Sequence, residues 1–434
     1  MQDIVIDLLI ILVKVVFVMV FLLQLLPLLI WGERKGAAYI QDRPGPNRAD
    51  IFGIRLAGLI HTLTDVVKLA FKEDLTPRGV YQPFYKVAPI ISMTVSLITF
   101  AVVPFGDFIQ VGDMKIPLQV ASLDTGILYT LAMGSLGVYG IMLAGWSSNN
   151  KYSLFGGVRS SAQMISYELT MSLSVAAMFV LYGTARLEEI VALQGVNPLT
   201  WGWFQGGPIG LLAFVMFATA SFAETNRLPF DLPEGESELV AGYHTEYSAF
   251  KFAMFFMAEY VNMVVASGLI VTLFFGGYQI PFLSTETLMT HMPLIAKVAF
   301  GGGAFGAFVV ALIAFKSYKP GHYGDNRDYE PLVVGLLGLG GAAASAAMAF
   351  LPGLGPIPGY DHPTMSSAAA ALLQFSIFAG KVLFFCWVFI WVRWTLPRFR
   401  YDQLMRLGWN YLLPIGFFNI LAAGLWVVFT YRPA

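Results

Sequence analysis

The sequence predicts an all-α membrane protein with about ten transmembrane helices. Of its 434 residues, 57% are hydrophobic and only 12% are charged, and the mean hydropathy is +0.68. These values lie outside the usual range for soluble domains and indicate a polytopic membrane protein. Apolar runs recur from one end of the chain to the other, so we expect residues 1–434 to form a single integral membrane domain.

Each predicted span is about 20 residues long, the length that a helix needs to cross a hydrocarbon layer of ~30 Å. An even number of crossings places both termini on the same side of the membrane. The ten expected spans are residues 8–30, 85–105, 124–145, 162–182, 204–223, 250–275, 294–315, 332–351, 370–394 and 411–430.

The distribution of positive charge orients these spans. Most Lys and Arg residues lie in the loops that follow the odd-numbered spans, and few lie on the opposite side. Cytoplasmic loops carry an excess of Lys and Arg. We therefore expect the large loops to be cytoplasmic and both termini to lie outside.

The segment between the first two spans contains a predicted amphipathic helix. Across residues 51–72 the apolar side chains recur on one helical face, while His61, Asp65 and Lys68 gather on the other. This pattern is typical of a helix that lies in the membrane interface. The alternative is a packed surface helix of a cytoplasmic domain.

The loop between the fifth and sixth spans is acidic where a cytoplasmic loop should be basic. Crowded carboxyl groups raise one another's pKa values, which is a property of proton-handling sites. On composition alone, a solvated acidic loop is the alternative. The loop has Arg227 as its only Lys or Arg, and its acids are Glu224, Asp231, Glu234, Glu236, Glu238 and Glu246.

Two further acids lie inside predicted spans. Glu168 occurs in AQMISYELTMS and Glu259 in FFMAEYVNMVV. Ionisable groups inside a membrane are costly and are functional-site candidates by default. A neutral, hydrogen-bonded acid within the helix bundle is the alternative for each.

The composition also argues against several classes of site. Cys386 is the only cysteine, and the five histidines lack metal-ligand spacing, so we expect no iron–sulfur cluster and no metal site in this chain. We find no dinucleotide or phosphate-binding glycine motif. A net charge of −1 suggests no nucleic-acid partner. Any redox cofactor should belong to a partner chain.

The acidic loop carries a long and specific motif, ETNRLPFDLPEGESELVAGYHTEYS. It resembles the quinone-site membrane subunit of respiratory complex I, which is of type H in bacteria and is numbered 1 in mitochondria. Four other segments are similar to that family in the same order along the chain: ERKGAAYIQDRPGPNR, HTLTDVVKLAFKED, GWSSNNKYSLFGGVRSSAQMISYE and RWTLPRFRYDQLMRLGW. The resemblance therefore covers most of the sequence.

The resemblance implies a function. The chain would be a subunit of a proton-pumping NADH:quinone oxidoreductase that forms the quinone chamber and links the peripheral redox arm to the membrane arm. Its substrate would be a quinone, with ubiquinone expected, and this chain would hold no flavin, iron–sulfur cluster or metal. Its partners would be the peripheral iron–sulfur subunit at the quinone site, small membrane-arm subunits and the lipid bilayer. A bacterial plasma membrane is favoured over the mitochondrial inner membrane.

The resemblance also implies residue roles. The residues that would line or gate the quinone chamber are Arg34, Asp65, Phe230 and Arg400. The residues that would form the proton path are Glu168, Glu224, Asp231, Glu234, Glu236, Glu238, Glu246 and Glu259, with Asp231 between the two groups.

One departure from the family pattern stands out. Residues 279–367 contain two extra apolar runs, so we expect eight family-like spans and a two-helix insertion. The membrane subunit of a related energy-converting hydrogenase is an alternative, but the pair QDRPGPNR and ETNRLPFDLPEGESELV favours complex I. A secondary transporter is less favoured, because we find no internal repeat.

Overall fold

The computed structural model describes residues 2–112, 114–233, 235, 239–318, 329–350 and 363–430. Helices dominate these ranges. The only strands in the described part are β1 (Phe108–Val111) and β2 (Met114–Pro117), an antiparallel hairpin in which Phe108 pairs with Pro117. The sequence-based expectation of an all-α membrane protein is therefore confirmed.

Nine helices of the described part are long and apolar enough to cross a membrane, and α7 is shorter, with 17 residues. They occupy the ten predicted positions. The α-helices are α1 (Gln2–Ile40), α2 (Ile60–Phe71), α3 (Gln82–Thr99), α4 (Gly126–Ser147), α5 (Lys151–Tyr182), α6 (Leu187–Gln194), α7 (Pro208–Glu224), α9 (Ala249–Phe274), α10 (Thr285–Thr290), α11 (Met292–Ser317), α12 (Glu330–Phe350), α13 (Pro363–Thr395), α14 (Tyr401–Arg406) and α15 (Leu413–Thr430). Short 3-10 turns lie at Leu56–Gly58, Phe100–Val102, Pro198–Thr200 and Gly242–His244, and a π-helical turn, Leu407–Leu412, joins α14 to α15.

Helix α5 begins at Lys151, well before the predicted start at residue 162. Asn150 caps it, since its side chain accepts a hydrogen bond from the Tyr152 backbone nitrogen. Small residues in the first turns let other backbones approach closely: a Cβ built on Gly156 would lie 2.6 Å from the Tyr243 nitrogen. The first turns are polar and rich in glycine, so the sequence predicts a loop there. In the structure these turns are helical, and several of their small residues are buried inside the protein.

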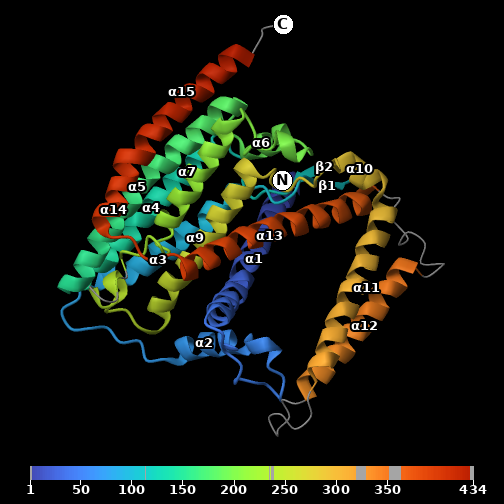
Figure 1. The fold of residues 1–434 in the computed structure, drawn as a ribbon, viewed down its shortest axis with the longest axis horizontal. Coiled ribbons are helices and arrows are strands. Elements are labelled where there is room, and N and C mark those ends of the chain that lie inside the picture. The colour runs from blue at the N-terminus through green and yellow to red at the C-terminus, as the bar shows by residue number, and fades with distance from the viewer. Residues whose placement is uncertain are drawn as a thin grey trace.

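Most of the helices form one bundle (Figure 1). Helix α5 packs against α4, α7 and α15, and α9 packs against α3, α7 and α13. Helix α1 runs beside α9 and α13. Large side chains such as Tyr167, Phe217, Phe274 and Phe378 are fully buried where these helices meet. The candidate site lies at one end of this bundle.

Helices α11 and α12 form a hairpin that packs mainly on itself and stands apart from the bundle in Figure 1. Both belong to residues 279–367, which the sequence predicts to be an insertion. Residues 319–328 and 351–362 of that range lie outside the described part. The hairpin contacts α10 and α13 through a few residues.

Helix α2 begins at Ile60, so the prediction of a helix from residue 51 is wrong for its first part. The residues before α2 include the 3-10 turn Leu56–Gly58. Phe52, Leu56 and Ala57 have φ values between 45° and 54°, which a right-handed helix cannot contain. The apolar residues before Ile60 have helical spacing, but the backbone there forms turns and not an α-helix.

Helix α2 itself has the predicted amphipathic character. Leu63 and Val66 are exposed, and Phe71 is 87% exposed, so the described protein does not cover the apolar face. Asp65 and Lys68 lie on the polar face. An uncovered apolar face is expected for a helix that lies in the membrane interface.

Both ends of the α2 segment are attached to the bundle. Before the helix, the Trp31 indole nitrogen on α1 donates a hydrogen bond of 3.0 Å to the Ala57 carbonyl. After it, Lys251 on α9 forms an ion pair of 2.9 Å with Asp74. These contacts fix where the polar face of α2 meets the rest of the protein.

Candidate functional site

A cluster of buried charges lies at the end of α1. The Glu33 carboxylate accepts hydrogen bonds from Arg227 at 3.1 Å and from the Tyr260 hydroxyl at 2.8 Å. Its other oxygen accepts from Arg393 at 2.5 Å. Buried charges persist only when they are paired and hydrogen-bonded. This single carboxylate therefore joins α1, the loop after α7, α9 and α13.

Arg227 is the most buried cation of the cluster, with 4% of its side chain exposed. Its guanidinium lies 4.2 Å from the ring centroid of Tyr260, close enough for a cation–π contact. Burial disfavours the charged form of Arg227, but Glu33, Tyr260 and Glu259 together outweigh this effect and raise the pKa of the guanidinium above its ordinary value. The only Lys or Arg of the acidic loop is thus turned inward.

The loop after α7 continues into a second, adjoining contact. Asp231 forms an ion pair of 2.9 Å with Arg398, which follows α13. Phe230 is 3% exposed and meets the ring of Tyr167 edge-on at 5.4 Å. The Gln163 side chain on α5 donates a hydrogen bond of 2.7 Å to the Phe230 carbonyl. The part of the loop around Phe230 and Asp231 is therefore packed into the bundle and is not solvated.

The four residues implied for the quinone chamber fall into two groups. Arg34 and Asp65 form an ion pair between α1 and α2, and both side chains are partly exposed. Phe230 lies in the bundle near Phe399, with ring centroids 5.4 Å apart. Arg400 is exposed and lines a pocket of about 340 Å³. Among the described residues, no hydrogen bond, ion pair or ring contact joins the first group directly to the second.

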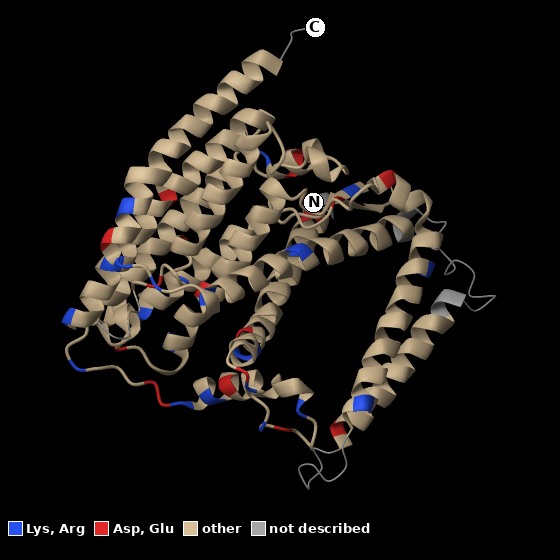
Figure 2. Cartoon of the chain, viewed as in Figure 1, with Lys and Arg blue, Asp and Glu red and all other residues tan. Residues whose placement is uncertain are grey.

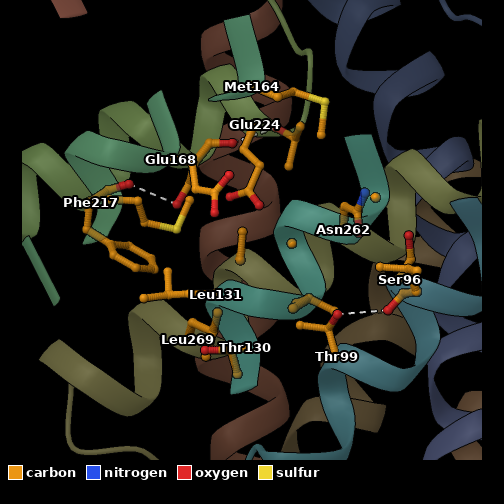
Figure 3. Close-up of a pocket in the computed structure, with 18 of the residues that line it drawn as sticks. Ser96, Thr99, Thr130, Leu131, Met164, Glu168, Phe217, Glu224, Asn262 and Leu269 are labelled. Carbon is orange, nitrogen blue, oxygen red and sulfur yellow. Dashed lines mark hydrogen bonds between the residues drawn. The ribbon is translucent and has the colours of Figure 1, made fainter. Parts of the chain in front are cut away.

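Glu168 and Glu224 lie together in a small cavity of about 50 Å³ between α3, α4, α5, α7 and α9. Figure 3 shows their carboxyl groups near each other, directed into this cavity. The Ser135 hydroxyl donates a hydrogen bond to Glu168. A Cβ built on Gly134 would lie 2.6 Å from a Glu224 carboxyl oxygen, so glycine leaves room for that group. Neighbouring residues of α4 thus accommodate both acids.

Two other acids of the predicted proton path have hydrogen-bond partners of their own. Glu259 on α9 accepts a hydrogen bond of 3.1 Å from the Tyr243 hydroxyl, and it lines a small void together with Arg227 and Asp231. Glu246 accepts a hydrogen bond of 2.6 Å from the Asn150 side chain. The remaining acids of the predicted proton path, Glu234, Glu236 and Glu238, lie outside the described residues.

Several members of the cluster were not predicted from the sequence. Glu33, Arg393, Arg398 and Tyr260 had no expected role. Glu33 opens one of the family-like motifs and Arg393 opens another, but nothing in the sequence indicates that residues so far apart share an ion pair. Among the described residues, no three His, Cys, Asp or Glu side chains lie close enough to hold a metal ion.

Comparison with known proteins assigns the chain to a family. A family model described as NADH dehydrogenase matches residues 13–319 and 331–424. The chain belongs to the NADH dehydrogenase family. The matched ranges of this NADH dehydrogenase family member include α1, the acidic loop, α9 and α13, which together form the charged cluster.

Curated NADH dehydrogenase relatives match over nearly their whole length. An NADH-quinone oxidoreductase subunit of type H from Solibacter usitatus is 41% identical over 96% of this chain and 97% of its own. One of the same type from Leptospira biflexa is 43% identical over 92% of this chain and 89% of its own. Another, from Koribacter versatilis, is 37% identical over 98% of this chain and 99% of its own. The resemblance to the type-H membrane subunits is therefore confirmed.

Proposed function

We propose that this chain forms the quinone chamber of a proton-pumping NADH:quinone oxidoreductase and links its peripheral redox arm to its membrane arm. The observation that carries the proposal is the buried cluster around Glu33. It stands between the partly exposed pair Arg34–Asp65 and the enclosed acids of the bundle. Relatives whose names include NADH-quinone oxidoreductase support the same reaction.

The chamber has an apolar approach and a polar interior. The uncovered apolar face of α2 suits entry of a hydrophobic quinone from the bilayer. Arg34 follows Glu33 on α1, and Asp65 lies on the polar face of α2. The quinone headgroup would pass beside this pair. Phe230, in the loop after α7, and Arg400, after α13, would border another part of the chamber. Electrons would come from the iron–sulfur cluster of a peripheral partner subunit.

Reduction of the quinone to quinol takes two electrons and two protons, and the acids of this chain would respond to that change of charge. Asp231 and Glu259 adjoin the cluster, and Glu168 and Glu224 share the cavity deeper in the bundle. Two carboxylates in one enclosed space repel each other. Protonation of one of them therefore stabilises the charged form of the other. Water or further side chains would complete the path between these acids, and Glu246 would extend it.

The distribution of charge supports an orientation. Most Lys and Arg residues gather at the end of the molecule that contains α2 (Figure 2). We therefore place this end in the cytoplasm and both termini outside, in a bacterial plasma membrane. The cytoplasmic end would contact the peripheral iron–sulfur subunit, and small membrane-arm subunits would pack on the exposed helices. Residues 279–367 remain our proposed insertion.

Photolabelling tests the proposal. The purified oxidoreductase complex is illuminated with a quinone that carries an azide on its headgroup, and labelled peptides are identified by mass spectrometry. We expect label on the peptides that contain Phe230 and Asp65, and an excess of unlabelled quinone should remove it. Label confined to other chains of the complex would refute a chamber in this subunit.

A further inference from the structure

A second cavity, of about 640 Å³, lies between α1, residues 44–59 and the α11–α12 hairpin. In Figure 1 the segment before α2 approaches the lower ends of α11 and α12. The α1 residues that line it are Leu28, Trp31, Lys35 and Tyr39. Their spacing of three or four places them on one helical face.

This face of α1 is not the face of the charged cluster. Glu33 is two residues from both Trp31 and Lys35, and residues two apart in an α-helix lie about 200° apart around the axis. Glu33 points to Arg227 and Arg393 in the bundle, whereas Lys35 donates a hydrogen bond of 2.8 Å to the Pro44 carbonyl beside the second cavity. The cavity is therefore separate from the proposed quinone chamber.

A buried ion pair closes one side of the cavity. The Arg55 backbone nitrogen and its Nε donate to the two carboxylate oxygens of Glu330, at 2.9 and 2.6 Å. More than nine-tenths of each side chain is buried. Arg55 precedes α2 and Glu330 begins α12, so this pair holds the hairpin against the segment that leads to α2.

The cavity has a polar end and an apolar wall. Lys35, Asn47, Arg55 and Glu330 line it near the polar loop, whereas Leu28, Ala314 and Val334 extend along the membrane-spanning helices. Among the described charged lining residues Arg55 is paired with Glu330, so Lys35 gives this end its net positive charge. In the same loop Arg43 and Arg48 are offset by Asp42 and Asp50. An occupant with a negative head and a long apolar chain would match both parts.

We propose that this cavity binds an anionic phospholipid. Its phosphate lies at the loop end near Lys35, and one acyl chain extends along α1 and α12. The volume is in the range of small-molecule sites, about 300–1,000 Å³. The membrane itself supplies such a ligand, and basic residues at its surface attract anionic lipids. In this proposal the α11–α12 hairpin forms one wall of a lipid-binding site.

A photoreactive lipid tests this inference. The intact complex is placed in nanodiscs that contain phosphatidylglycerol with a diazirine on one acyl chain. After illumination we expect label on the peptides around Trp31 and Val334. Val334→Trp places a bulky ring on the cavity wall beside the proposed acyl chain and should lower this label. Leu336→Trp is the matched control, because Leu336 is 57% exposed on the same helix and does not line the cavity.

A second variant tests the headgroup. Lys35→Gln should lower labelling by phosphatidylglycerol about fivefold, the loss expected for one basic residue near an anionic lipid, and should leave labelling by a phosphatidylcholine probe unchanged. Electron transfer from NADH to a hydrophilic acceptor, together with the subunit content, verifies assembly of each variant.

Three results would overturn the proposal. Equal labelling by the two lipids in the wild-type complex would exclude recognition of the anionic head. Labelling of the Val334 peptide by a photoreactive quinone would assign the cavity to quinone. Chemical cross-links from residues of the cavity to another protein chain, without lipid label, would show that a partner subunit fills it.

Discussion

Glu33 and Arg227 form a buried ion pair of 3.1 Å, although 194 positions separate them in the sequence. Arg393 shares the same carboxylate. Removing one member of a buried pair leaves the other charge uncompensated, which costs about 3–5 kcal/mol. The pair therefore links stability to the geometry of the proposed chamber.

We expect Glu33→Ala to destabilise the protein by about 3–5 kcal/mol, because two arginines would then lose their anion. The complex should accumulate poorly in membranes and lose subunits at lower temperature. Quantitative immunoblots and thermal-shift measurements on the purified complex provide the readout. Glu73→Ala removes an exposed carboxyl after α2 and is the control. Equal stability of the two variants would contradict the importance of the buried pair.

Asp65→Ala should impair quinone reduction without loss of assembly. Its ion pair with Arg34 is partly exposed, so its contribution to stability is at most about 1 kcal/mol. We expect NADH:quinone turnover to fall while NADH oxidation by a hydrophilic artificial acceptor stays normal. Lys68→Ala, on the same polar face, is the control. Normal quinone turnover in Asp65→Ala would leave Arg34–Asp65 as a surface ion pair only.

Glu168→Gln should uncouple or slow the enzyme while the complex remains assembled. Glutamine keeps the size of the side chain and can still accept the hydrogen bond from Ser135, but it has no titratable proton. Loss of a positioned group that transfers protons costs about 10²–10⁴-fold in rate. NADH:quinone turnover and proton pumping in membrane vesicles measure both effects.

Glu286→Gln provides the comparison for Glu168→Gln, since Glu286 is exposed on α10. Glu259→Gln should resemble Glu168→Gln if both acids serve the same path. Wild-type rates of turnover and pumping in Glu168→Gln would mean that this acid is a neutral structural group.

Lys381→Met should destabilise the contact between α9 and α13. The Lys381 ammonium on α13 donates hydrogen bonds of 2.8–2.9 Å to the carbonyls of Phe275, Gly277 and Gln279, just after α9. Each buried carbonyl left without its donor costs about 1–3 kcal/mol. We expect a lower melting temperature of the purified complex. Lys297→Met, at an exposed position on α11, should leave it unchanged.

The order of the helices can be predicted well from the sequence, because apolar runs long enough to cross a membrane are unambiguous. Their ends are predicted poorly. Helix α1 continues past residue 30 because Glu33 and Lys35 are buried and bonded within the protein. The sequence-based prediction treated these polar residues as a loop because it assumed that they are in contact with water.

The candidate site was predictable as a set of acids but not as a geometry. Glu168 and Glu224 stand out in the sequence as carboxyls near apolar runs, and the structure places them in one cavity. Arg393 and Tyr260 were missed because their roles depend on contacts with Glu33 across the fold. Helical periodicity indicates which face of its own helix a residue occupies. It does not indicate which other helix packs against that face.

The two attachments of the α2 segment restrict how that helix can move. Trp31 holds the chain before it at Ala57, and Lys251 holds the chain after it at Asp74. A helix tethered at both ends cannot swing outward like a hinged flap without breaking one tether. Rotation about its own long axis would break the Arg34–Asp65 ion pair and the hydrogen bonds that His61 accepts from the Arg48 and Ala49 backbone nitrogens. A hydrophobic molecule passing there would therefore meet a helix that is held in both position and rotation.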